Sequence, residues 1–286
     1  MIRLTNKMRE LVQKMMTIDI HDPIEGFSLS EQDLFEVNIG KRGDNLFLGY
    51  YSKNGLKSIF QKYRITAKLN RLGFNNLKID LDTSDPYKHK IKIKNVIADN
   101  IETLVELVIR RDFVKVEMPF ECAQNGQMYE ALVVEWLKMQ NPRKKFRRTR
   151  PQLPGQDFPG LGIGSDALEL LVMASRRLGL HGIINIPDHY HNAYFYSRMF
   201  KFGNPQEQAI FKALTRDTLL YPISKVAWAI ENGKVNNVLE NETFKWFISK
   251  QIFPLAKDWI KLFKSKAYKS EVNKYMSNYK FRIRNK

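Results

Sequence analysis

The sequence contains a single cysteine, Cys122, among its 286 residues. No disulfide can therefore form within the chain, and so little cysteine is typical of a reducing compartment. No apolar run approaches the length of a membrane span. The N-terminus also lacks an apolar signal core followed by small residues. These absences predict a cytoplasmic protein without a membrane span.

Acidic residues are few relative to basic ones. Lysine and arginine number 47, aspartate and glutamate 30, and the net charge is +17. Such an excess favours an anionic partner, which can be a nucleic acid, an acidic protein or membrane surface, or a phosphorylated ligand such as coenzyme A. The charge alone does not choose among them.

Several common catalytic and binding motifs are also missing. No Ser-His-Asp or Cys-His arrangement stands out, so hydrolysis by a triad is unsupported. No Gly-Lys-Ser/Thr ending of a Walker loop occurs, and no G-x-G-x-x-G pattern of a dinucleotide fold. His189 and His191 lack a third and fourth ligand nearby, so we expect no metal site.

The first part of the chain alternates between patterns typical of helices and strands. Met1–Met16 can form an amphipathic helix that packs on its own domain. We then predict a hairpin of Leu34–Ile39 with Leu46–Tyr51, and a basic helix at Gly55–Leu72 that stops at Gly73. A second strand pair follows at Leu77–Leu81 and His89–Lys94.

The middle of the chain allows two interpretations. Tyr129–Met139 has apolar residues at helical spacing, and we favour a helix there. Ile101–Val108 also has helical spacing, whereas Phe113–Met118 alternates like a strand. In the alternative, Leu104–Val116 and Tyr129–Met139 are two long paired strands. The helical interpretation would repeat the order β-α-β-α on both sides of Asn141, as a degenerate internal repeat would.

A glycine-rich loop follows, and we expect the rest of the chain to be organised around it. Gly160, Gly162 and Gly164 alternate just before Ser165–Leu178, which has helical periodicity and is followed by Gly179. Glycine lets a backbone approach a ligand closely, and the first turn of a helix has unpaired N–H groups. The loop is therefore a candidate phosphate site or only a tight turn.

The next elements and the preceding basic stretch add to this pattern. Gly182–Pro187 is typical of a short buried strand, and a second helix then carries Asn192, Ala193, Phe195 and Tyr196. Before the loop, Arg143–Arg150 is the densest basic cluster of the chain. It can be an exposed lead-in to a strand at Arg148–Leu153, or it can contact phosphates or RNA.

Over about residues 146–202, this order resembles the GNAT family of acyl-CoA-dependent N-acyltransferases. In that family the pattern Arg/Gln-x-x-Gly-x-Gly/Ala holds the coenzyme A pyrophosphate. Its two glycines match Gly162 and Gly164, whereas Pro159 replaces the Arg/Gln and has no backbone N–H. Asn192, Ala193, Phe195 and Tyr196 match a later motif, whose closing Gly-Phe is here Lys201-Phe202.

The resemblance implies a set of site residues. The coenzyme A pyrophosphate would lie on the amides of Leu161, Gly162, Ile163, Gly164 and Ser165, and Asn192 would also contact the cofactor. Tyr196 falls where many family members place the acid that protonates the leaving thiolate. For the base we propose His189, with Asp188 and His191 in the same loop. Glu130 and Glu135 are candidates only if Tyr129–Met139 is a strand.

The sequence therefore predicts an α/β protein with a GNAT-like mixed sheet flanked by helices and an all-helical C-terminal extension. The expected helices of the extension are Gln206–Leu214, Ile223–Asn232, Glu242–Phe253 and Leu255–Phe263. We divide the chain into residues 1–140, an acyl-CoA-binding core at 141–203, and a basic extension at 204–286. Two functions remain open. One is N-acyl transfer from an acyl-CoA, taken as acetyl-CoA, to an unidentified amine. The other is a non-catalytic module that contacts nucleic acid or an acidic protein.

Overall fold

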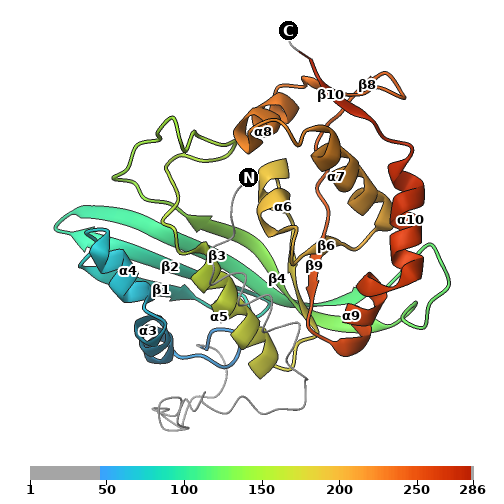
Figure 1. The fold of residues 1–286 in the computed structure, drawn as a ribbon. Helices are drawn as coiled ribbons and strands as arrows, with labels where there is room; N and C mark the ends of the chain where they lie inside the picture. Colours follow the sequence, from blue (N-terminus) through green and yellow to red (C-terminus); the bar gives the residue numbers. More distant parts are fainter. Residues whose placement is uncertain (1–45, 285–286) are drawn as a thin grey trace.

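A seven-stranded mixed sheet forms the centre of the computed structural model, which describes residues 46–284 (Figure 1). The strand order is β1-β2-β3-β4-β5-β9-β6. Neighbouring strands are antiparallel except for β4 and β5, which are parallel. The predictions for Met1–Met16 and Leu34–Ile39 fall outside the described residues. The predicted α/β class, with a mixed sheet flanked by helices, is confirmed.

The first four strands form an antiparallel meander. They are β1 (Leu77–Asp82), β2 (Lys88–Ile97), β3 (Asn100–Lys115) and β4 (Met128–Met139). The helix that we favoured at Tyr129–Met139 is therefore wrong, and the paired-strand alternative is correct. Ala131, Leu132 and Val133 are all buried, because both faces of β4 are covered. A strand buried on both faces loses the alternation that would distinguish it from a helix.

Helices cover both faces of the sheet. On one face, α3 (Lys53–Lys62), α4 (Ile65–Arg71) and α5 (Gly164–Arg177) share a core with Leu132 and Ile183. On the other face, α9 (Lys257–Lys264) and α10 (Lys266–Met276) pack against Ala131, Val133 and Ile184. Successive residues of β4 and of β5 thus enter different cores, as the pleat of a strand requires.

Two predictions before β1 need correction. The helix expected at Gly55–Leu72 is two helices, because Arg64 between them adopts a left-handed conformation with φ of 58°. The strand expected at Leu46–Tyr51 is a tight turn closed by a bridge between Phe47 and Tyr51. The Leu48 amide donates to Nδ1 of His89 on β2, which fixes this turn to the sheet.

The helix after the glycine loop and the strand after it are confirmed as α5 and β5 (Gly182–Asn185). The order strand, glycine loop, helix and strand on which the GNAT resemblance rests is therefore present as β4, loop, α5 and β5. The strand before the loop, however, is β4, and the expected strand at Arg148–Leu153 forms no more than a bridge between Arg147 and Arg150.

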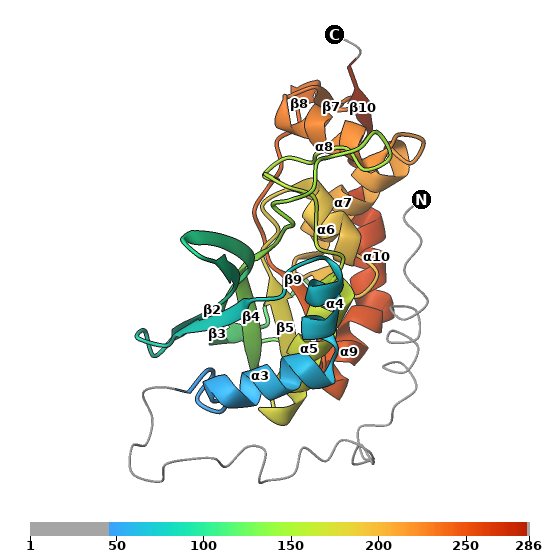
Figure 2. The ribbon, with the colours of Figure 1, turned by 90° about the vertical axis from the view of Figure 1, so that its left-hand side faces the viewer.

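The C-terminal part contains helices, but it is not all-helical. A third core of α6 (Tyr190–Tyr196), α7 (Pro205–Asp217) and α8 (Ile223–Glu231) lies at the end of the molecule that also carries a three-stranded sheet (Figure 2). That sheet has the order β10-β7-β8, with β10 at Phe281–Ile283, β7 at Val235–Asn237 and β8 at Glu242–Thr243.

The predicted helix Glu242–Phe253 is replaced by β8, an irregular segment and β9 (Gln251–Pro254). β9 lies between β5 and β6 (Lys201–Phe202) in the central sheet. The sheet therefore takes strands from each of the three segments into which we divided the sequence. Within residues 46–284, no helix has both the length and the apolarity that a membrane crossing requires.

Candidate functional site

The candidate site lies where β4 separates from β5. Their parallel pairing runs from Ala131–Gly182 to Val134–Asn185 and then stops. At the same point β4 carries one extra residue relative to β3, because Val134 pairs with Ile109 and Trp136 with Val108, leaving Glu135 unpaired in the register. A bulge of this kind bends its strand and increases the local twist. The bend leads β4 away from β5 and opens a slot between them.

The far end of the slot is closed by the chain that follows β4. The Leu161 amide donates to the Met139 carbonyl at 3.2 Å, and the Asn141 amide donates to the Pro159 carbonyl at 2.7 Å. The loop before α5 is thereby attached to the end of β4. Between this attachment and the last β4–β5 pair lies a cavity of about 320 Å³. Its walls come from β4, from the segment at residues 154–156 and from residues 185–196.

The glycine loop presents free backbone donors beside this slot. The N–H groups of Gly162, Ile163, Gly164 and Ser165 donate to no backbone carbonyl within residues 46–284. Gly162 has a φ of 79°, which a residue with a side chain adopts only with strain. The Leu161 amide, which we expected to be available, is instead used by Met139.

Tyr196 extends from α6 toward the start of α5. A Cβ atom on Gly164 would lie 3.9 Å from the Tyr196 hydroxyl and 3.7 Å from Cε of Met139. Tyr196 lines the slot, and no hydrogen bond to its hydroxyl is found among the described residues. Burial raises the pKa of Tyr196. The hydroxyl therefore keeps its proton near neutral pH and can donate it.

The two histidines of the predicted loop both line the slot but differ in environment. Nδ1 of His189 lies 3.3 Å from Oε2 of Glu231 on α8. His191 is buried, and its Nδ1 has no partner within the described part of the chain. Burial, with a smaller contribution from His189, lowers the pKa of His191 to about 4. His191 is therefore neutral at physiological pH.

Two amide side chains contribute further polar groups. Asn192, predicted as a cofactor contact, lines the slot, as does Asn185 at the end of β5. Oδ1 of Asn185 is buried and receives no hydrogen bond from any described residue. An orphaned buried acceptor costs free energy unless a ligand or water satisfies it. Asn185 and the His191 ring thus leave one acceptor and one ring nitrogen available to a bound molecule.

Neither glutamate of β4 is a free base. Glu130 is paired with Arg111 at 2.6 Å. Glu135 is paired with Lys88 and with Arg110, each at 2.7 Å. Burial would raise the pKa of Glu135, but the hydrogen bonds from Lys88 and Arg110 outweigh it and hold that pKa below its usual value. Glu135 is therefore an ionised carboxylate already engaged on the sheet.

The basic cluster divides into a structural and an available part. Arg143 donates to both carboxylate oxygens of Glu102 and to the Gly73 carbonyl. Four other cationic side chains of the cluster line a second cavity of about 360 Å³ against Pro159 and Gly160. It is lined by Lys144, Lys145, Arg147, Thr149 and Arg150. No ion pair within residues 46–284 engages these lysines and arginines, so they can receive an anion next to the glycine loop.

Several residues of the site were not found from the sequence. Gly155 packs so closely on His189 that a Cβ atom there would lie 2.7 Å from Nε2 of the ring. Oε1 of Gln140 accepts from the Phe158 amide and shapes the wall of the slot. Glu231 arrives from α8, far along the chain, and no local pattern announces its pairing with His189. Among the described residues no cluster of His, Cys, Asp or Glu could hold a metal ion.

Comparison with known proteins adds little to this geometry. No protein-family model matches the chain, and no curated protein sequence does. Among solved structures, it is similar to the KacTA–DNA complex at 13% identity and a TM-score of 0.27, covering 81% of this chain and 93% of that one. AtaTR bound with AcCoA gives 13% identity and a TM-score of 0.28, with 78% and 90% covered. AtaT complexed with acetyl-methionyl-tRNAfMet gives 13% and 0.27, with 56% and 82% covered.

Proposed function

We propose that this protein transfers an acyl group from an acyl-CoA to an amine, with the coenzyme in the slot between β4 and β5. The observation that carries the proposal is the coincidence of three features at one place. The bulge at Glu135 opens the sheet, the free amides of Gly162–Ser165 lie beside the opening, and Tyr196 extends toward them. An extended chain with a diphosphate at one end fits a slot that ends at a helix N-terminus.

The residues present fit the parts of coenzyme A in turn. The pyrophosphate would accept hydrogen bonds from the amides of Gly162–Ser165, where the α5 dipole also favours negative charge. The amide-containing arm would lie along the unpaired stretch of β4 and meet the orphaned Oδ1 of Asn185, with Asn192 nearby. The ribose phosphate would enter the basic cavity of Lys144–Arg150.

The reaction requires two proton transfers, and we assign each of them to one side chain. Acyl transfer forms a carbon–nitrogen bond, breaks the carbon–sulfur bond, removes a proton from the amine and delivers one to the sulfur. Tyr196 holds its proton near neutral pH and would act as the acid. His189 would act as the base, with Glu231 orienting its ring as the carboxylate of a triad does. His191 is too weak a base for that role. Its neutral ring would instead pack against the neighbouring side chains and keep them in position.

A second candidate function is a non-catalytic basic module that contacts nucleic acid or an acidic protein. Two observations favour it. Pro159 has no N–H and the Leu161 amide is already used, so the loop offers fewer donors than a full phosphate loop. The unpaired cations of Lys144–Arg150 would also attract a polyanion.

The test is calorimetric titration with acetyl-CoA and with coenzyme A at moderate salt. We compare the natural protein with the double variant Gly162→Asp/Gly164→Asp, whose carboxylates would repel the pyrophosphate. Gly126→Asp is the matched control, because Gly126 also has a positive φ of 84° and no atom within 4 Å of an added Cβ. We expect saturable binding that the control keeps and the double variant loses by at least about tenfold in affinity.

Binding that the double variant retains would contradict the pyrophosphate site at this loop. Absence of any binding would remove the acyltransferase proposal and favour the second function. An electrophoretic shift assay with RNA and DNA, repeated with a charge-reversal variant of the basic cavity, would then test that alternative.

A further inference from the structure

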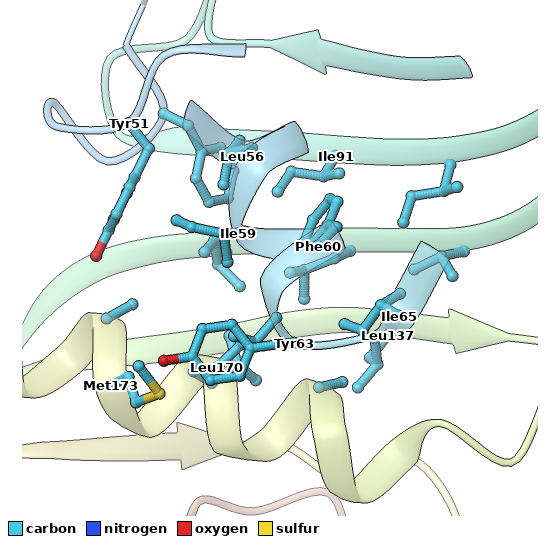
Figure 3. Close-up of a pocket in the computed structure, with 18 of the residues that line it drawn as sticks. Tyr51, Leu56, Ile59, Phe60, Tyr63, Ile65, Ile91, Leu137, Leu170 and Met173 are labelled. Atoms are coloured by element: carbon cyan, nitrogen blue, oxygen red, sulfur yellow. The ribbon is translucent and has the colours of Figure 1, made fainter. Parts of the chain in front are cut away.

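A separate apolar cavity lies under α3 and α4, on the face of the sheet that α5 also covers (Figure 3). Its volume is about 130 Å³. Its walls come from α3, α4, α5 and strands β2–β4, and apart from two tyrosine hydroxyls and one arginine they are apolar. Side chains labelled in Figure 3 that line it include Leu56, Ile59, Phe60, Leu137, Leu170 and Met173.

This apolar cavity adjoins the slot that we assign to coenzyme A. Leu137 and Met139 of β4 line both cavities. The ideal Cβ position on Gly164 lies 3.7 Å from Cε of Met139 and 3.9 Å from the Tyr196 hydroxyl. Met139 therefore lies between the slot and the apolar cavity, and both its Cε and the Tyr196 hydroxyl approach the start of α5. Methionine is unbranched and changes rotamer readily, so it can move aside more easily than a branched side chain.

We propose that the apolar cavity receives the acyl chain of a medium-chain acyl-CoA, of about six to eight carbons, which enters from the slot past Met139. This inference rests on the proposed function and names its donor substrate. A dry apolar cavity of about 150 Å³ accepts a benzene molecule, which has six carbons. A cavity of about 130 Å³ therefore has room for about five or six carbons beyond a thioester that remains in the slot.

The opposite end of the cavity helps to distinguish two possible occupants, the acyl chain of an acyl-CoA and a free fatty carboxylate. Nε of Arg177 donates to the Tyr50 hydroxyl at 2.9 Å, and its guanidinium lies 4.9 Å from the centroid of that ring. Arg177 lines the cavity and forms no ion pair within residues 46–284. A free carboxylate of the same length could place its charge there. The two residues shared with the slot favour the thioester.

The experiment measures the affinity of the full chain for acetyl-, hexanoyl-, octanoyl- and dodecanoyl-CoA by calorimetry without an amine. Each methylene that leaves water strengthens binding about fourfold at most. We expect octanoyl-CoA to bind at least about thirtyfold more tightly than acetyl-CoA. Dodecanoyl-CoA should gain no further affinity, because the cavity is then full.

A pair of matched variants locates the chain. Ala174→Leu places a larger side chain in the cavity wall and should reduce the octanoyl-to-acetyl affinity ratio to below about three. Ala267→Leu makes the same change at an exposed position of α10 and should keep the ratio of the natural protein. Met139→Phe should also reduce the ratio, because a rigid ring would close the passage.

The outcomes separate this inference from the proposed function. If acetyl-CoA binds and Gly162→Asp/Gly164→Asp abolishes that binding, but chain length has no effect, the acyl cavity is wrong and the transferase site remains. If no acyl-CoA binds, both fail. If octanoate binds equally well to that double variant while octanoyl-CoA gains nothing over acetyl-CoA, the occupant is a free carboxylate and the thioester route is overturned.

Discussion

The rings of His189 and His191 stack on one another, with centroids 5.4 Å apart and planes inclined by 13°. The contact places an accessible imidazole paired with Glu231 directly on a buried one whose Nδ1 has no partner. A positive charge on His189 therefore disfavours protonation of His191. The pair combines a candidate base with a ring that stays neutral.

The stability of the protein should depend on pH through His191. Burial lowers its pKa from 6.5 to about 4, so between these values the unfolded chain binds a proton that the folded one does not. Stability is then fully present above about pH 6.5 and is lost as the pH falls toward 4. Between pH 7.5 and pH 4.5 this group should remove about 2–3 kcal/mol.

Urea unfolding of the natural protein and of His191→Phe at both pH values measures this contribution. The variant keeps an aromatic ring in the stack but cannot titrate, so its stability should fall by that much less. Equal losses in the two proteins would show that His191 is not the group responsible.

Gly155→Ala should disturb His189 as well as the backbone. Gly155 has a φ of 71°, and the added Cβ would lie 2.7 Å from Nε2 of the His189 ring. Gly126→Ala is the matched control, with a φ of 84° and no atom within 4 Å of the added Cβ. Each substitution should lower the free energy of unfolding by about 1 kcal/mol, because alanine is strained in the left-handed conformation. The contact with His189 should make Gly155→Ala destabilising by about 1 kcal/mol more, and this substitution should also weaken acetyl-CoA binding.

Urea unfolding and calorimetry on both variants check this expectation. Equal effects on stability and on binding would mean that the His189 ring moves aside without cost.

Breaking the ion pair between Lys68 and Asp166 should cost more than breaking one at the surface. The two side chains meet at 2.6 Å, and Asp166 in the first turn of α5 is only 2% exposed. Lys68→Met leaves that carboxylate without the ammonium and should destabilise the protein by about 1–3 kcal/mol. Lys115→Met breaks a pair with Glu117 in which both partners are exposed, and it should cost less because both charges stay in contact with solvent. Denaturant midpoints with unchanged slopes measure the difference, and similar midpoints would contradict it.

The basic cavity should distinguish coenzyme A from its form without the ribose phosphate. Arg147→Glu/Arg150→Glu should lower the affinity for coenzyme A at least about tenfold, because two bidentate donors become repulsive. The same variant should lose less than about threefold in its affinity for dephospho-CoA. Lys266→Glu/Lys269→Glu on exposed positions of α10 changes the net charge equally and should affect neither ligand. Parallel losses for both ligands would place the ribose phosphate elsewhere.

Local sequence patterns predicted the elements whose formation depends mainly on residues close in the sequence. The glycine loop and the helix after it follow from glycine spacing and apolar periodicity, and His189, Asn192 and Tyr196 line one slot. Their roles in binding and catalysis remain predictions.

The errors arose where tertiary contacts override a local pattern. In β4, Tyr129 and Val133 pack on one face and Leu132 on the other, and together with the exposed Trp136 they match helical spacing although the segment is a strand. Strand β9 is four residues long, includes the fully buried Gln251 and has no pattern of its own. The pairing of His189 with Glu231 joins α6 to α8 and could not be derived from spacing.

The position of β9 has a consequence for how the site arises during synthesis. β9 fills the sheet between β5 and β6, although it follows both in the chain, after α7 and α8. Until residues 251–254 leave the ribosome, the edge of β5 away from the slot has no neighbour. Nascent chains generally fold from the N-terminus as residues appear. The sheet around the slot is therefore completed late, and a chain released early would carry the glycine loop, His189 and His191 with the outer edge of β5 uncovered.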